Sequence, residues 1–232
     1  MRDGITRSTA RVAMLAVAML IVAGTAARAD IVLGLEGYWK LDQLFDSNLD
    51  VVEMTDSHHA EINSSFSSPT SVAGKLDKGF DYEASDTTVV DAGNGLQLNS
   101  VNTATFAAWI KPESFRGNTG AISRNGIIGD NLNNVIFMLT DQGRLALTWD
   151  AGVDDYHGLQ ADAGDALEAG AFYHVAATRN GANIDLYING VKVKSAANQP
   201  TGNFAAFGHI QLGRVNGTTG RDFDGVIDDV RV

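Results

Sequence analysis

Apolar and polar residues alternate in three short runs between residues 173 and 195. Two Asn-Gly dipeptides, Asn180-Gly181 and Asn189-Gly190, separate the runs. Alternation with a period of two is typical of half-buried strands. Asn-Gly between such runs is a strong hairpin signal, because type I′ turns need positive φ at both central residues. The segment therefore predicts an antiparallel three-stranded meander.

The same strand–turn–strand pattern recurs along most of the chain. Asp141-Gln142-Gly143 separates two apolar runs and predicts a second hairpin with glycine in its turn. Further strands are expected at residues 36–41, 60–63, 78–82, 87–92, 105–111, 135–140, 144–149, 210–215 and 225–232. About a dozen short strands without a long amphipathic helix favour an all-β fold, an antiparallel two-sheet β-sandwich.

The first 29 residues have the features of a secretory signal peptide. Three arginines within residues 2–11 precede an apolar run over residues 12–23, and Ala27-Arg28-Ala29 places small residues where signal peptidase cleaves. The apolar run is shorter than the ~20 residues that cross a bilayer. We therefore expect cleavage before Asp30, a secreted or periplasmic location, and no membrane span in residues 30–232.

The charge balance excludes several classes of partner. The chain has 17 Lys+Arg and 28 Asp+Glu, of which the first 29 residues hold four arginines and one aspartate. Residues 30–232 therefore carry 13 basic and 27 acidic residues, a net charge of −14. Such a surface repels nucleic acid and is compatible with neutral ligands or cations. The absence of cysteine excludes thiol catalysis and Cys-ligated zinc, and with the leader it favours a bacterial extracytoplasmic protein.

Five segments, in order, carry a family resemblance. They are GYWKLDQ (37–43), SVAGKLDKGFDYEASDTTVVDAG (71–93), ATFAAWIKPES (104–114), YHVAATRNGANIDLYINGVKV (173–193) and FDGVIDDVRV (223–232). Together they resemble the LamG-like jelly-roll domain of the concanavalin A-like lectin/glucanase superfamily, over nearly all of residues 30–232. The resemblance implies one jelly-roll domain of two stacked antiparallel sheets, commonly an extracellular recognition module for carbohydrate.

The chain departs from the family pattern at two places. Family members continue past the final strand, so we expect a missing closing segment after Val232. The early loop Thr55-Asp56-Ser57-His58-His59 lacks the family's glycines. The adjacent histidines are expected to be exposed rather than metal ligands.

Catalysis is not expected. Retaining glucanases need two carboxylates ~5 Å apart, and the family signature Glu-x-Asp-x-x-Glu or Glu-x-Asp-x-Glu does not occur in the sequence. The aspartates at 150–155 and 162–165 lie in glycine-containing loops typical of solvated acids. We therefore expect a non-catalytic module. A glycoside hydrolase or lyase of the same superfamily remains an alternative, as does a protein-binding or adhesive structural module.

The resemblance also suggests a structural Ca²⁺ ion. Asp228 on the last strand would help to hold it near the early loop, with Asp42 or Asp56 as partner. Calcium takes 6–8 oxygen ligands, so carboxylates and carbonyls from a loop and a strand are suitable. The alternative is that these aspartates serve turns and solvation. The period of two predicts that Asp228 and Asp229 point to opposite faces.

A glycan site requires an exposed aromatic ring beside hydrogen-bonding groups. Trp149 alternates with Leu145 and Leu147, and Trp39 with Leu41, so both tryptophans are expected in the core. Trp109 shares its face with Thr105, Ala107 and Lys111 and is the candidate platform, unless a neighbouring strand buries it.

Polar residues around the middle strands complete the predicted ligand site. Arg124, Asn133 and Asn134 are candidates for its rim, although asparagine is also a common turn residue. His174, next to Tyr173, is expected to be a hydrogen-bonded structural histidine. A glycan is the expected partner and an extracellular protein the second choice.

Overall fold

The computed structural model of the chain describes residues 35–45, 50–53, 60–61, 68–85, 88–93, 96, 98–115, 125–132, 134–151, 156–205, 208–214 and 222–232. Within these ranges it contains 16 strands and two short 3-10 helices, η1 (Leu98–Ser100) and η2 (Ala163–Asp165). All strand pairs are antiparallel, as the alternation predicts. The predicted signal peptide lies outside the described residues.

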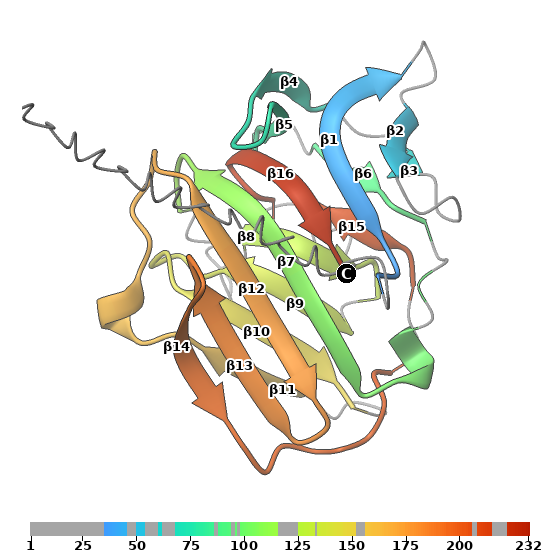
Figure 1. Ribbon diagram of the computed structural model, residues 1–232, viewed down its shortest axis with the longest axis vertical. Coiled ribbons are helices and arrows are strands. Elements are labelled where there is room, and N and C mark those ends of the chain that lie inside the picture. Colours follow the sequence, from blue (N-terminus) through green and yellow to red (C-terminus); the bar gives the residue numbers. More distant parts are fainter. Residues whose placement is uncertain are drawn as a thin grey trace, which may run out of the picture. The chain divides into compact units, whose positions relative to one another are not determined.

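One layer of the fold is built around the strands of the predicted meander (Figure 1). Its hydrogen-bonded order runs through β14 (Val191–Ala196), β13 (Asn183–Ile188), β12 (Tyr173–Asn180), β7 (Thr103–Pro112) and β16 (Gly225–Arg231). Two further strands complete it beside β16, β5 (Lys78–Tyr82) and β4 (Thr70–Ala73). We call this layer the first sheet.

The second sheet stacks behind the first in Figure 1. Its order is β11 (Tyr156–Gln160), β10 (Leu145–Asp150), β9 (Val135–Leu139), β8 (Asn125–Asp130), β15 (Ile210–Leu212) and β6 (Val90–Asp91). The ladder continues into the first sheet through β3 (Ala60–Glu61), β2 (Asp50–Glu53) and β1 (Tyr38–Phe45). The architecture is a two-sheet β-sandwich, which confirms the predicted fold class.

The core between the sheets contains the side chains that the alternation places there. Trp39 and Trp149 are both 0% exposed, as predicted. On β12 the buried positions are Val175, Ala177 and Arg179, and the residues between them face outward. Full burial of a Val, Leu, Ile or Phe side chain in this core contributes roughly 1.5–3 kcal/mol to folding.

The turns agree only partly with the prediction. Asn189 (φ 50°) and Gly190 (φ 79°) have the two positive φ angles of a type I′ turn, as expected. The first Asn-Gly turn is different, because Asn180 pairs with Asn183 and stays in the ladder. Its loop is Gly181-Ala182, with positive φ only at Gly181, which is the pattern of a type II′ turn. The prediction that Asn180 is a central turn residue is wrong.

The structure also adds strands to the predicted set, namely β2, β4, β8 and β11. All six residues of β8, NGIIGD, are buried, so this strand has no polar face to reveal it. Among the described residues, no helix has the length and apolar composition to span a membrane.

Candidate functional site

The register of the first sheet arranges its outward side chains in rows. Thr105 lies opposite Thr178, and Thr178 opposite Asp185. The next row, two residues further along β7, is formed by Ala107, Ala176 and Tyr187. We call this surface the outer face. Neighbouring strands are ~4.8 Å apart, so side chains in one row can contact a single ligand.

A polar hollow of about 540 Å³ opens on the outer face. Four strands contribute to it, and it is lined by Thr103, Thr105, Thr178, Arg179, Asn180, Asn183, Asp185, Lys192 and Ser195. Hydroxyl, amide and charged groups dominate this lining; the Arg179 side chain itself is fully buried. These residues were not predicted from the sequence, because the register that places Thr103 and Thr105 of β7 beside the strands β12–β14 is not visible in it. The detectable signal is polar residues at alternate positions, as at 103 and 105, 178 and 180, and 183 and 185.

Asp185 is the carboxylate of the hollow. Its carboxylate accepts hydrogen bonds from Ser195 Oγ at 2.5 Å, Lys192 Nζ at 3.1 Å and the Tyr187 hydroxyl at 3.2 Å. The Ser195 hydroxyl, then Lys192 and Tyr187, lower the pKa of Asp185 below its usual value. Asp185 is therefore an ionised acceptor held in one orientation by three donors.

Trp109 lies two rows from the hollow and is half-buried. The Lys75 ammonium lies over the indole, 5.1 Å from the ring centroid. The His174 ring meets it edge-on, with 5.2 Å between centroids. Burial, and then the charge of Arg231, lower the pKa of His174, so this imidazole is neutral at pH 7. Trp109 thus lies on the outer face in contact with two polar side chains.

A second polar group on this face joins β1 to β16. The Asp229 carboxylate accepts hydrogen bonds from the Tyr38 hydroxyl at 2.5 Å and from Arg231 Nη2 at 3.1 Å. The Arg231 guanidinium also stacks over the Tyr38 ring, at 4.8 Å. Asp229 has φ 54° in a β-bulge of β16, where the register shifts between Asp228 and Arg231. The bulge breaks the alternation, so the prediction of opposite faces for Asp228 and Asp229 is wrong.

Asp228 lies beneath the β4–β5 turn and is 1% exposed. Its Oδ2 accepts the backbone N–H groups of Lys75 and Leu76, both at 2.8 Å. Its Oδ1 has no hydrogen-bond partner among the described residues. Burial raises its pKa to about 6, and the charges of Asp229 and Asp42 add to the shift. Asp42 accepts the backbone N–H of Lys78 at 3.2 Å, whereas Asp56 lies outside the described residues.

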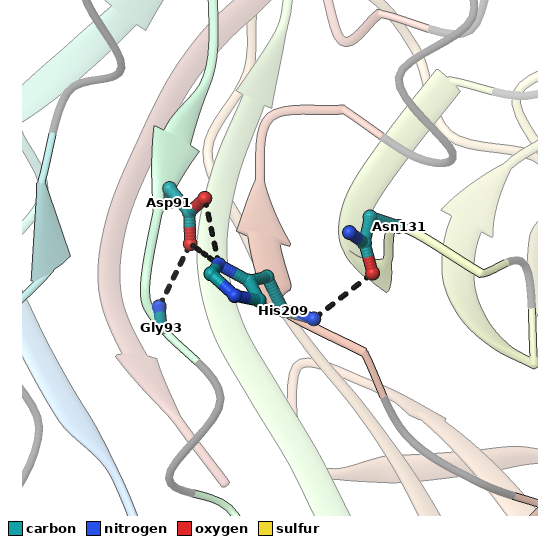
Figure 2. Close-up of polar contacts among 4 residues, drawn as sticks. All are labelled: Asp91, Gly93, Asn131 and His209. Carbon is teal, nitrogen blue, oxygen red and sulfur yellow. Dashed lines mark hydrogen bonds and ion pairs between the residues drawn. The ribbon is translucent and has the colours of Figure 1, made fainter.

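The predicted polar rim is only partly visible, since Arg124 and Asn133 lie outside the described residues. Asn134 closes the β8–β9 turn, where its backbone N–H donates to Asp130 Oδ1 at 2.6 Å. Figure 2 shows a polar cluster that the sequence did not predict, which includes Asn131 of the same turn. His209 Nδ1 lies 3.1 Å from both carboxylate oxygens of Asp91, and the His209 backbone N–H donates to Asn131 Oδ1 at 2.9 Å.

Three carboxylates gather at the far end of β7 from the hollow. Oxygens of Asp81, Glu83 and Glu113 lie within 4.8 Å of one another. Burial raises the pKa of Asp81, Lys111 opposes the shift, and Asp224 adds to it. This group offers oxygen ligands, but two of its three members are exposed.

Comparison with known families agrees with this architecture. Residues 84–232 match the model of the concanavalin A-like lectin/glucanases superfamily. The chain belongs to this superfamily. The matched region includes β7, β12–β14 and β16, the strands that form most of the outer face. No curated protein matches the chain in sequence.

Solved structures with the same fold include carbohydrate-binding and enzyme-associated domains. Domain 4 of AbnA, a GH43 extracellular arabinanase from Geobacillus stearothermophilus solved with arabinotriose, is 20% identical (TM-score 0.63; 85% of this chain, 90% of that one). The binding domain of Paraclostridial Mosquitocidal Protein 1 is 14% identical (TM-score 0.63; 85% of this chain, 48% of that one). Trypanosoma rangeli sialidase in complex with the inhibitor DANA is 11% identical (TM-score 0.58; 85% of this chain, 30% of that one). The chain thus spans less than half of the last two proteins, and all three likenesses show the fold alone.

Proposed function

We propose that this protein is an exported, non-catalytic module that binds a glycan on the outer face of its first sheet. The observation that carries the proposal is the polar hollow of about 540 Å³. A volume in the range of small-molecule sites, with several convergent polar groups, suits a sugar. The superfamily, and the arabinotriose-bound domain with the same fold, support a carbohydrate ligand.

The chemistry of the hollow suits hydroxyl groups. Threonine and serine hydroxyls donate and accept, asparagine amides do both, and the Asp185 carboxylate accepts. Because three neighbours already orient Asp185, a sugar hydroxyl meets a fixed acceptor and little ordering entropy is lost on binding. The strongly negative chain also favours a neutral ligand over nucleic acid.

We further propose that Asp228 and Asp42 hold a structural Ca²⁺ ion. Asp228 Oδ1 is buried and has no hydrogen-bond partner in the described part of the chain, which fits a cation, because an ionised oxygen in that position is costly unless it is compensated. Bound calcium would supply that compensation. Asp228 already fixes the β4–β5 turn through Lys75 and Leu76, so the ion would stabilise the turn that places Lys75 over Trp109.

Glycoside hydrolysis is a second candidate function, favoured by one observation. Asp81 and Glu113 have carboxylate oxygens within 4.8 Å, close to the ~5 Å of a retaining pair. The raised pKa of Asp81 suits a general acid. Two observations argue against glycoside hydrolysis. Glu113 is exposed, and it follows the ten-residue strand β7, so it lies roughly 33 Å from Thr103 at the hollow. Release of reducing sugar that Asp81→Asn abolishes would establish this activity.

A glycan array on the purified protein, run with calcium and then with EDTA, tests the proposal. We expect binding to a defined glycan that Asp185→Ala weakens at least tenfold. Asp141→Ala, an exposed substitution in the β9–β10 turn, is the matched control and should bind as the original protein does. If a folded sample binds no glycan, the proposal is wrong and a protein-binding or structural role replaces it.

A further inference from the structure

We infer that Asp185 and Lys192 form a subsite of the hollow that binds two hydroxyls on adjacent carbons of one sugar, a vicinal diol. The inference rests on the proposed glycan binding. It names the ligand class as a neutral glycan with a free vicinal diol, rather than a uronate or an amino sugar. Both residues line the hollow, and their pairing and their remaining hydrogen-bonding groups carry the inference.

A β-bulge in β14 places Lys192 beside Asp185. Asp185 pairs with Ser195 across β13 and β14. An unbroken register would then set Val193 opposite Tyr187, but the register shifts and Lys192 pairs with Tyr187 instead. Val193 is partly buried against the core, whereas the Lys192 side chain is 50% exposed. Bulges re-aim side chains in this way, so the outer face gains an ammonium where regular pairing would put an apolar group.

The subsite keeps hydrogen-bonding capacity for a ligand. A carboxylate has about four acceptor positions, and described side chains of β13 and β14 fill three of those of Asp185. Lys192 has three N–H donors, and among the described residues it donates to Asp185 alone. The Ser195 hydroxyl donates to Asp185, so its oxygen can still accept. One acceptor position of the carboxylate and two donors of the ammonium are therefore open to a ligand.

These open groups match a vicinal diol. Lys192 Nζ and Asp185 Oδ2 lie 3.1 Å apart, so a donor and an acceptor stand side by side in the hollow. Hydroxyls on adjacent sugar carbons also lie close to hydrogen-bond distance from each other, and each can donate or accept. One hydroxyl can therefore donate to the carboxylate while its neighbour accepts from the ammonium. Both hydrogen bonds are charge-assisted and so are stronger than neutral ones.

The same pair selects against charged sugars. Asp185 and Lys192 carry opposite charges and face one hollow. A uronate carboxylate bound to Lys192 would lie beside the ionised Asp185, and the ammonium of an amino sugar bound to Asp185 would lie beside Lys192. Like charges in contact are unfavourable, so either ligand must disrupt the pair. A diol carries no charge and leaves the pair intact.

A glycan array on the purified full-length protein tests this inference. One set of slides is untreated, and a second set is oxidised with periodate and then reduced with borohydride. Periodate cleaves the carbon–carbon bond of a vicinal diol and leaves isolated hydroxyls unchanged. We expect binding to neutral glycans on the untreated slides, roughly tenfold or more stronger than to uronate or amino-sugar glycans, and a similar loss on the treated slides.

Two lysine variants locate the effect in the hollow. Lys192→Met removes the donor but keeps an unbranched side chain, so it should weaken binding roughly tenfold or more, which is what a hydrogen bond to a charged group contributes. Lys194→Met is the matched control and should bind as the original protein does. Lys194 is on the same strand, but its ammonium pairs with Asp162, and neither residue lines the hollow.

Binding that survives periodate treatment, or that Lys192→Met leaves unchanged, would overturn the diol subsite but not glycan binding itself. A preference for uronates or amino sugars would overturn it as well. If a folded sample binds no glycan on the untreated slides, the proposed function fails and the subsite with it, so the two failures are distinguishable.

Discussion

Lys75 connects Trp109 to Asp228. Its ammonium lies over the Trp109 ring, 5.1 Å from the centroid, and its backbone N–H donates to Asp228 Oδ2 at 2.8 Å. Asp228 also pairs with Trp109 across β16 and β7. A buried carboxylate thus helps to determine where the Lys75 ammonium lies on the outer face, so the protonation state of Asp228 affects that face.

The stability of the protein should depend on pH through Asp228. Its pKa in the folded state is about 6, above the usual value of 3.8, so the folded protein holds this proton more tightly than the unfolded chain does. The resulting stabilisation is complete below pH ~4 and is lost as the pH rises to about 6. Without calcium, Asp228→Asn should therefore be more stable than the original protein at pH 7, by about 1–3 kcal/mol, and equal to it near pH 4.

Urea denaturation in EDTA at pH 4, 5 and 7 measures this difference. Asp141→Asn removes the same charge from an exposed turn and should change the free energy of unfolding by less than about 0.5 kcal/mol. A stability difference for Asp228→Asn that is the same at all three pH values would show that burial does not perturb this carboxyl.

Calcium should reverse the order of stability at pH 7. An ion that binds only the folded state adds about 2.7 kcal/mol to the free energy of unfolding when its concentration is 100 times the dissociation constant. We expect calcium to raise the melting temperature of the original protein but not of Asp228→Asn or Asp42→Asn, and to have no effect at pH 4. Differential scanning calorimetry checks this, with magnesium as the control ion because it demands a smaller, octahedral site. An equal calcium response in all three proteins would place the ion elsewhere.

The β13–β14 turn and the burial of two tryptophans were predictable from sequence, because local patterns determine them. Trp39 and Trp149 alternate with leucines, and Asn189-Gly190 adopts the turn that its residue types favour. The bulge at Asp229 was not predictable from a local stretch of sequence, because the Asp229 carboxylate is hydrogen-bonded to the hydroxyl of Tyr38, 191 residues away.

The candidate site was predicted only in part. Trp109 was a candidate for an outward aromatic ring from its own strand, with burial beneath a neighbouring strand as the alternative. Its contact with Lys75 depends on the packing of a distant turn against β7. The hollow around Asp185 requires the register between β7, β12 and β13, since Thr105 and Asp185 are neighbours only through Thr178. Sequence gives the polar positions on each strand but not their alignment.

Two glycines should respond oppositely to substitution by alanine. Gly190 has φ 79°, and Gly164 has no positive φ; a methyl group would meet open space at both. Gly190→Ala should lower the free energy of unfolding by about 1–2 kcal/mol, because the left-handed conformation is strained for alanine. Gly164→Ala should raise it by about 0.4–1 kcal/mol, because it restricts the unfolded chain. Urea denaturation of both variants measures the two changes in the free energy of unfolding. Equal changes would contradict the type I′ turn at Asn189-Gly190.

Arg179 should be essential for the segment that joins the two sheets. Its buried guanidinium lies 4.5 Å from the Phe204 ring centroid, and Nη2 donates to the carbonyls of Pro200 and Gly202. Arg179→Ala leaves a cavity and two unpaired acceptors, so it should cost about 3 kcal/mol and speed hydrogen exchange in residues 199–205 more than in β9. Lys194→Ala, which breaks the exposed pair with Asp162, is the control and should cost under about 1 kcal/mol. If both variants cost the same, the buried guanidinium does not hold this segment.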